Sequence, residues 1–215
     1  MSKRLLIADD HSLLRQGVRQ LLTDEFPEFA FAEADSLDSV LDHLGANPID
    51  LLLMDLGMPG MAGAESLRAL REAHPTARII VVTGVDERSM ILDCLAAGVH
   101  GYVLKASPVE EIIRAVRMVL AGDIYVASAL ASIGTERTVN VMRAALPTVP
   151  MDTTRFTARQ VQVLQLLAQG RSTKDIARIL ELGPGTVKIH LAAIYRRLNA
   201  HNRTEAVVLA SKLNL

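Results

Sequence analysis

The sequence predicts an α/β domain followed by an all-α domain: a doubly wound sheet of five parallel strands in a (βα)5 arrangement, a helical linker and a C-terminal unit of four helices. Three observations lead to this expectation. Five short apolar runs alternate with five helical patterns up to residue 122, which is typical of a parallel sheet covered by helices. Residues 152–215 show helical periodicity alone. The net charge also changes sign, because residues 1–151 hold 13 Lys and Arg against 20 Asp and Glu, whereas residues 152–215 hold 10 against 4.

The elements of the first expected domain follow one another along residues 1–122. The run LLLM at 51–54 is apolar on both faces, as a central parallel strand should be. We expect strands at 4–8, 30–34, 51–54, 78–83 and 101–104, and helices at 12–22, 37–44, 64–73, 87–97 and 109–121.

A linker is expected between the two domains. The periodicity weakens after Gly122, and the two prolines of LPTVPMDTT (146–154) are typical of a connecting segment. Between these points, ERTVNVMRAAL (136–146) fits a connecting helix. We therefore expect the linker at 123–151 and the second domain at 152–215.

The second domain is expected to begin with two capped helices. TARQ has the capping-box form, with Thr157 as the N-cap and Gln160 at N3, and Gly170 ends this helix. Ser172 or Thr173 can cap a short second helix. Its inner face is expected to hold Ile176, Ile179 and Leu180.

A glycine turn and a longer helix follow. LGPG (182–185) turns the chain, and Pro184 suits the first position of the third helix. The buried stripe of that helix is expected at Val187, Leu191, Ile194 and Leu198, and its opposite side carries Lys188, Arg196 and Arg197. Two short helices, a turn and a basic exposed second helix match a helix-turn-helix, and a basic domain of this kind is suited to a polyanion.

Composition and the N-terminus exclude several classes of protein. The longest apolar run is a few residues, far below the roughly 20 that span a bilayer, and MSKRLLIADD lacks the apolar core of a signal peptide. We therefore expect a cytoplasmic protein with no membrane partner. The single cysteine, Cys94, rules out an internal disulfide and a multi-cysteine zinc site. The absence of Trp argues against stacking on single-stranded nucleic acid.

Charged and hydroxyl side chains stand at the carboxyl ends of four expected strands. Asp9 and Asp10 follow the first strand, Asp55 the third and Lys105 the fifth, while Thr83 ends the fourth. Ligands of open parallel sheets bind beyond these ends, so the five side chains are expected to converge. Like charges together need a cation, and Mg²⁺ prefers carboxylate oxygens and water. A carboxylate can also attack a phosphoryl group, with Mg²⁺, Lys105 and Thr83 stabilising the phosphoryl oxygens.

Each of these residues has a structural interpretation when it is taken singly. Asp9 or Asp10 can cap the following helix, and Asp55 can be a turn residue. Thr83 can be an ordinary strand residue, and Lys105 a solvated lysine at a strand end. Their joint placement favours a pocket. The remaining residues considered for chemistry are expected to serve packing or the surface, namely Cys94, His43, His74 and His100.

Two ordered sets of motifs, which cover nearly the whole chain, carry a family resemblance. The first set is IADDHSLLRQGV (7–18), LLLMDLGMPGMAG (51–63), VVTG (81–84) and GYVLK (101–105). The second set is FTARQVQVLQLLAQGRSTKDIARIL (156–180), TVKIHLAAIYRRL (186–198) and NRTEAV (202–207). Through the first set, residues 1 to about 122 resemble a response-regulator receiver domain. Through the second, residues 152–215 resemble a LuxR-type helix-turn-helix, and the combination resembles the NarL/FixJ family.

The resemblance implies a phosphorylation site in the first domain. Asp55 would accept a phosphoryl group from a partner histidine kinase. The implied Mg²⁺ ligands are Asp10, Asp55 and the backbone carbonyl of Gly57, with Asp9 assisting, and the implied phosphoryl-oxygen ligands are Thr83 and Lys105. Tyr102 matches the family's aromatic switch position, for which a half-buried strand aromatic is the alternative interpretation.

The resemblance also implies DNA contacts through the third helix of the second domain. Lys188 and Ile189 fall where the family contacts bases, and Ala192 lies where many relatives have a longer polar side chain. A short apolar side chain can touch a thymine methyl group but cannot hydrogen-bond to a base edge. The expected phosphate neighbours are Thr186, His190, Lys174 and Arg196, for which a solvated basic face is the alternative.

The second domain departs from the family pattern at two further positions, and its last helix has an unusual number of apolar residues. Gln162 stands where the family usually has a glutamate. Gly183 replaces the usual Ser or Thr cap of the recognition helix, which should cost roughly a few tenths of a kcal/mol. The last helix, at about 203–213, has more apolar residues than one buried stripe requires, and in the family it pairs two domains. The residues expected at such a dimer contact are Val207, Val208 and Lys212.

The expected function is that of a two-component response regulator that binds double-stranded promoter DNA, as a homodimer when phosphorylated, and not that of an enzyme. A phosphorylation-independent DNA-binding regulator with a vestigial pocket is the alternative. An enzyme that uses the acidic cluster for turnover, such as an aspartyl-phosphate phosphatase, would need a second general acid and a substrate pocket, and the sequence indicates neither.

Overall fold

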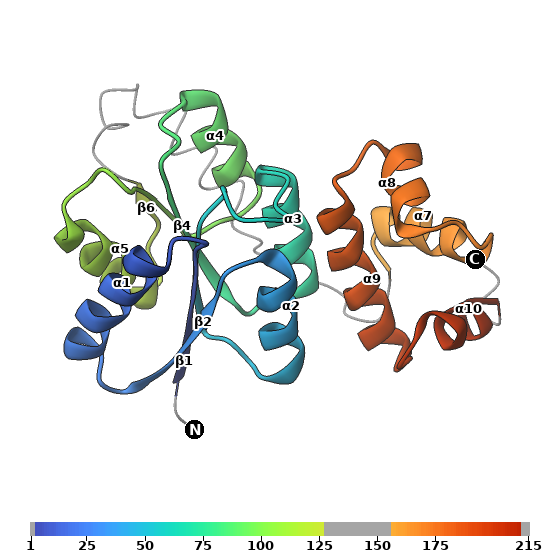
Figure 1. The fold of residues 1–215 in the computed structure, drawn as a ribbon, viewed down its shortest axis with the longest axis horizontal. Helices are drawn as coiled ribbons and strands as arrows, with labels where there is room; N and C mark the ends of the chain where they lie inside the picture. The colour runs from blue at the N-terminus through green and yellow to red at the C-terminus, as the bar shows by residue number, and fades with distance from the viewer. Residues whose placement is uncertain (1–2, 127–155, 212–215) are drawn as a thin grey trace. The chain divides into compact units, whose positions relative to one another are not determined.

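The computed structural model describes residues 3–126 and 156–211 (Figure 1). The chain forms two compact units, Met1–Pro147 and Thr148–Leu215, which we call the N-terminal unit and the C-terminal unit. Most of the expected linker, including the helix expected at 136–146, lies outside the described residues. Among the described helices, none combines the length and the apolar character needed to cross a bilayer.

The N-terminal unit is built on a parallel sheet with the strand order β2-β1-β3-β4-β5-β6. The strands are β1 (Lys3–Ala8), β2 (Phe29–Ala34), β3 (Leu51–Met54), β4 (Arg78–Thr83), β5 (Gly101–Leu104) and β6 (Tyr125–Val126). The five expected strands are confirmed. The sixth strand, β6, was not expected from the sequence, because two residues are too few to show a period. In β6, Tyr125 pairs with Gly101 and Val126 with Tyr102.

Five helices connect the strands and cover both faces of the sheet. They are α1 (Ser12–Glu25), α2 (Leu37–Ala46), α3 (Ala64–Ala73), α4 (Arg88–Ala96) and α5 (Val109–Ala121). In Figure 1, α1 and α5 lie on one face, and α2, α3 and α4 lie on the other. The expected doubly wound α/β fold is therefore confirmed, and α1 continues three residues beyond its expected end at 22.

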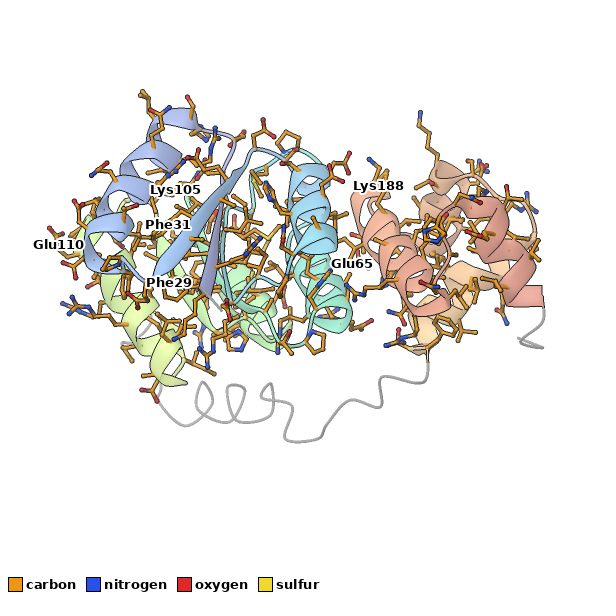
Figure 2. The ribbon with its side chains drawn as sticks, turned by 90° about the horizontal axis from the view of Figure 1, so that it is seen from below. Phe29, Phe31, Glu65, Lys105, Glu110 and Lys188 are labelled. Carbon is orange, nitrogen blue, oxygen red and sulfur yellow. The ribbon has the colours of Figure 1, made fainter. Side chains whose placement is uncertain are left out.

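The core of the N-terminal unit explains why LLLM reads as a central strand. All four residues of β3 are buried. Leu51 and Leu53 pack towards α1 and α5, in one cluster with Leu22 and Val119. Phe29, labelled on β2 in Figure 2, belongs to the same cluster, and Phe31 packs against it. Burial of a leucine side chain stabilises the folded state by on the order of 1.5–3 kcal/mol. The buried strand β3 is therefore held firmly in the sheet, and it supports the side chains at the edge.

The C-terminal unit contains the four expected helices. They are α7 (Ala158–Ala168), α8 (Thr173–Leu180), α9 (Pro184–Leu198) and α10 (Arg203–Ser211). Their core cluster includes Val163, Leu167, Ile176, Val187, Leu191, Ile194 and Ala206, which confirms the stripe expected for the third helix, and Leu198 packs against this cluster.

One face assignment in this unit was wrong. Ile179 was expected on the inner side of the second helix, but its side chain is 47% exposed. Ile176 and Ala177 are buried and Leu180 packs on the core. Because consecutive helical residues are about 100° apart, Ile179 is turned away from Leu180 towards solvent.

Candidate functional site

The predicted pocket residues lie at the carboxyl edge of the sheet. Two backbone hydrogen bonds align the strand ends there: the Asp55 amide donates to the Ala8 carbonyl at 2.9 Å, and the Lys105 amide donates to the Thr83 carbonyl at 2.8 Å. The parallel register thus places residues from β1, β3, β4 and β5 at one edge.

Lys105 joins two buried carboxylates. Its Nζ atom lies 2.8 Å from Asp9 Oδ2 and 2.8 Å from Asp55 Oδ2, and both aspartates are only 4% exposed. Figure 2 marks Lys105 at this edge of the N-terminal unit. Partial burial alone would lower the pKa of Lys105, but hydrogen bonds and charge attraction from Asp55 and Asp9 outweigh it and raise that pKa above its ordinary value. The lysine therefore stays charged.

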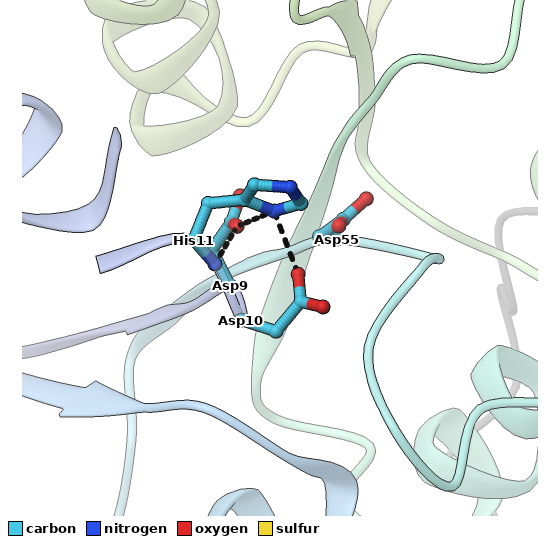
Figure 3. Close-up of side chains that lie close together, drawn as sticks. All are labelled: Asp9, Asp10, His11 and Asp55. Atoms are coloured by element: carbon cyan, nitrogen blue, oxygen red, sulfur yellow. Dashed lines mark hydrogen bonds and ion pairs between the residues drawn. The ribbon is translucent and has the colours of Figure 1, made fainter. Parts of the chain in front are cut away.

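Asp10 and His11 complete an acidic cluster. One ligand atom from each of Asp9, Asp10, His11 and Asp55 lies within 4.8 Å of the others (Figure 3). His11 Nδ1 is 2.8 Å from Asp10 Oδ1 and 3.2 Å from Asp9 Oδ1. His11 was not among the residues expected at the site, although its position directly after two aspartates was a usable signal.

The donor set of this cluster fits a hard divalent cation. The cluster brings three carboxyl groups together, and two of them, those of Asp9 and Asp55, share the single ammonium group of Lys105. Carboxylate oxygens are the ligands that Mg²⁺ prefers. Gly57 leaves space beside the Asp55 carboxylate, because a Cβ atom at position 57 would lie 3.1 Å from Asp55 Oδ2.

A chain of hydrogen bonds runs from the pocket towards Tyr102. Thr83 is buried, and its Oγ1 atom accepts a hydrogen bond from the Val85 amide at 3.4 Å. The Tyr102 hydroxyl donates to the Val85 carbonyl at 2.7 Å. Tyr102 is fully buried, and burial, followed by the charges of Cys94, Asp86 and Asp55, raises the pKa of its phenol. Tyr102 is thus more buried than the half-buried strand aromatic of the alternative interpretation, and its hydroxyl is hydrogen-bonded to the loop after β4.

The residues expected to contact DNA are distributed around α9 and α8. Lys174, Lys188, Ala192 and Arg196 are exposed, and Lys188 is labelled in Figure 2. Ile189 and Thr186, expected beside bases and phosphates, are instead fully buried. His190 is buried as well, and burial and the nearby charge of Arg159 lower its pKa to about 4. Its imidazole is therefore neutral at physiological pH, and the DNA contacts stay predictions.

The start of α7 is held by hydrogen bonds to the side-chain amide of Gln160. Gln160 is 1% exposed, and its Oε1 atom accepts hydrogen bonds from the Thr157 amide at 3.1 Å and from Arg197 at 3.0 Å. The expected capping box is confirmed, since the Thr157 side chain accepts from the Gln160 amide. Gln162, which replaces the usual glutamate, accepts a hydrogen bond from Arg159 at 3.0 Å.

Two other expectations for the C-terminal unit concern a cap and the last helix. Gly183 is the N-cap of α9 and has no side-chain cap bond, as its lack of a side chain predicts. On α10, Val208 is 52% exposed and Val207 packs against the core. Lys212 lies outside the described residues, so the dimer contact stays a prediction.

Comparison with known families and proteins covers both units. Residues 5–117 match the model of the response regulator receiver domain, and residues 154–210 match that of the bacterial regulatory proteins of the luxR family. The chain is 36% identical over 210 residues to the nitrate/nitrite response regulator protein NarP of Escherichia coli (strain K12), which covers 96% of this chain and 93% of that protein.

A second relative and a solved structure extend the comparison. The glycerol metabolism activator of Pseudomonas putida is 33% identical over 214 residues, covering 98% of this chain and 96% of that protein. RcsB from Salmonella enterica serovar Typhimurium, solved bound to a promoter in the presence of phosphomimetic BeF3⁻, has a TM-score of 0.56 at 20% identity. That likeness covers 99% of this chain and 100% of that one and concerns the fold alone.

Proposed function

The chain belongs to the NarL/FixJ family of response regulators, DNA-binding transcriptional regulators with a receiver domain and a LuxR-type domain, and we propose that phosphorylation of Asp55 by a histidine kinase switches this one. The observation that carries the proposal is the contact of Lys105 with both Asp55 and Asp9 at 2.8 Å. It holds an ammonium group where the oxygens of a phosphoryl group on Asp55 would need a positive charge.

The proposed reaction moves a phosphoryl group from nitrogen to oxygen. An Asp55 carboxylate oxygen attacks phosphorus and forms the P–O bond, the P–N bond to the kinase imidazole breaks, and that nitrogen keeps the electron pair. Lys105 turns from the carboxylates to the new phosphoryl oxygens. The Thr83 hydroxyl, at the neighbouring strand end, then donates a hydrogen bond to one of these oxygens.

The acidic cluster would hold the divalent ion that this reaction needs. Asp10, Asp55 and the Gly57 carbonyl would be the ligands, with Asp9 assisting, and bound Mg²⁺ would offset the charge of the phosphoryl oxygens. The space at Gly57 beside Asp55 Oδ2 supports this assignment. The three carboxyl groups of the cluster, with one ammonium group between two of them, also suit a divalent ion.

The backbone of Val85 would carry the signal away from Asp55. Its amide now binds Thr83 Oγ1, and its carbonyl binds the Tyr102 hydroxyl. If Thr83 turned to a phosphoryl oxygen, it would release the Val85 amide, and the loop that carries Val85 could change its place relative to Tyr102. Such a change would shift the population between inactive and active forms.

The output of the switch would be DNA binding by the C-terminal unit as a homodimer. The exposed Lys188, Lys174 and Arg196 support phosphate or base contacts, and the exposed Val208 on α10 supports a dimer contact. A regulator of bacterial promoters would act where the chromosome lies, in the cytoplasm.

Labelling with a small phosphodonor tests the proposal. With Mg²⁺ and acetyl phosphate, we expect the wild-type chain to take up one phosphoryl group, detected by mass spectrometry, and to bind promoter DNA more tightly. Asp55→Asn should take up none and show no gain in DNA binding. The matched control is Asp42→Asn, an exposed aspartate on α2. Labelling of Asp55→Asn to the wild-type extent would refute the assignment.

A further inference from the structure

We propose that Arg15 is a positioning residue for the divalent-ion site: by holding the Asp9 carbonyl it fixes the direction in which Asp10 presents its carboxylate. The inference rests on the proposed function, since it concerns the ion that the acidic cluster would bind. Arg15 lies on α1, and its NH1 atom donates a hydrogen bond of 2.6 Å to the Asp9 carbonyl oxygen.

Every polar group of Asp9 is held in place. Its amide donates to the Ala34 carbonyl at 3.0 Å, and its carboxylate accepts from the His11 amide and contacts Lys105, each at 2.8 Å. The carbonyl is the remaining group, and Arg15 binds it. Asp9 is therefore fixed at its amide, its side chain and its carbonyl.

The direction of the Asp10 carboxylate depends more on the backbone than that of the Asp9 carboxylate does. Its side chain is 36% exposed, against 6% for that of Asp9, and its carboxylate contacts the exposed imidazole of His11. The Asp9 carbonyl and the Asp10 amide belong to one planar peptide unit. A bond that fixes this carbonyl therefore fixes the plane from which the Asp10 side chain leaves the chain.

Arg15 is itself oriented by a rigid partner on β2. Its Nε atom donates to Glu33 Oε2 at 2.8 Å, and Arg19 donates to Glu33 Oε1 at 2.7 Å. Hydrogen bonds from Arg19 and Arg15 lower the pKa of Glu33, which is thus ionised at neutral pH. The Arg15 side chain is only 16% exposed. A guanidinium group offers donors in a fixed fork, so one side of it can bind Glu33 while the other binds the Asp9 carbonyl.

The expected consequence is a change in ion affinity rather than in the phosphoacceptor. Arg15 does not contact Asp55 through any hydrogen bond or ion pair recorded among the described residues. Groups that orient metal ligands typically change metal affinity by 10–100-fold when they are removed. We therefore expect the dissociation constant for Mg²⁺ to rise on the order of 10-fold in Arg15→Met.

Arg19 provides a matched control. It pairs with the same carboxylate of Glu33, on the other oxygen, whereas within the described part of the chain the hydrogen bond to the Asp9 carbonyl comes from Arg15. Arg19→Met removes the same type of side chain from the same helix, so we expect a change of less than about 2-fold in Mg²⁺ affinity. Arg15→Lys keeps the charge but has no fork, so it should weaken Mg²⁺ binding by an intermediate factor.

Isothermal titration of the full chain with MgCl₂ measures these affinities without any phosphodonor. Urea unfolding of each variant shows whether it folds. If Arg15→Met does not fold, the Mg²⁺ affinity of Arg15→Lys tests the role of Arg15 instead. A second readout is the rate of labelling by acetyl phosphate: in Arg15→Met this rate should return to within about 2-fold of wild type at saturating Mg²⁺, because the effect is on ion affinity. A general loss of structure would lower the rate at every Mg²⁺ concentration.

The outcomes separate this inference from the proposed function. If the wild-type chain binds Mg²⁺ and is labelled on Asp55, but Arg15→Met binds Mg²⁺ as tightly as wild type or no more weakly than Arg19→Met, the role of Arg15 is wrong and the proposed function stands. If the wild-type chain binds no Mg²⁺, the proposed function fails, and the inference fails with it.

Discussion

Single residues in the N-terminal unit show how position in the sheet sets protonation. At the carboxyl edge, Lys105 is held charged between Asp9 and Asp55. At the start of β5, on the opposite edge, His100 is held neutral: burial, followed by the charges of Arg71 and Arg78, lowers its pKa to about 4. Its Nδ1 atom accepts a hydrogen bond from the Ile79 amide at 3.1 Å, which requires that nitrogen to be unprotonated.

We expect His100 to destabilise the folded chain as the pH falls from about 6.5 towards 4. In this range the unfolded chain binds a proton that the folded protein does not, so the free energy of unfolding decreases. Asn at this position can accept the same hydrogen bond without titrating. Between pH 7 and pH 5, His100→Asn should lose on the order of 1 kcal/mol less stability than wild type, as measured by urea unfolding. Equal losses in both proteins would contradict this assignment.

Among the helices, α7 shows how a local signal and a distant contact combine. The capping box of Thr157 and Gln160 is visible in the sequence and present in the structure. The bond from Arg197 to Gln160 Oε1 comes from α9, 37 positions away, and could not be read from a local pattern. The same limit explains Ile179 on α8, whose apolar character indicated burial although its place on the helix faces solvent.

Removal of the cap should loosen the start of α7. Thr157→Ala loses the side-chain acceptor for the Gln160 amide, which typically costs about 1 kcal/mol. We expect amide hydrogen exchange in the first turn of α7 to become about 5-fold faster, as measured by mass spectrometry of the full chain. Thr157→Ser keeps the acceptor and serves as the control. An unchanged rate in Thr157→Ala would show that the Thr157 side chain does not hold this turn.

At the scale of the whole molecule, the chain separates two charge characters. Residues 1–151 are acidic and hold the proposed ion site, whereas residues 152–215 are basic and hold the helix-turn-helix. A net charge of −1 for the whole chain conceals this division. A basic surface attracts the phosphate backbone of DNA, and each neutralised phosphate releases counterions.

DNA affinity should therefore depend steeply on salt. If Lys188 contacts a phosphate, Lys188→Ala should reduce the slope of log K against log salt by about 1, as measured by fluorescence anisotropy with a promoter fragment. If Lys188 reads a base instead, affinity should fall while the slope stays near that of wild type and sequence preference relaxes. Arg114→Ala, an exposed arginine on α5, is the control. Unchanged affinity, slope and preference in Lys188→Ala would remove this residue from the interface.

The sequence by itself determined the order of the elements, the five main strands and the residues at their carboxyl ends. These features depend on local periodicity and on the residues that end a strand or cap a helix. The meeting of Asp9, Asp55 and Lys105 also followed from sequence, because parallel strands place their carboxyl ends at one edge. The family resemblance added the assignment of Asp55 and Tyr102, which no period could supply.

Only the tertiary structure decided which atoms touch. The hydrogen bond from Lys105 to Asp55 joins positions 50 apart, and the one from Tyr102 to Val85 joins positions 17 apart. Arg15 donates directly to the Asp9 carbonyl, and its partner Glu33 on β2 orients it. Such contacts depend on side-chain rotamers and on the packing of helices against the sheet, which leave no period in the sequence. The sequence therefore located the pocket, and the fold determined its geometry.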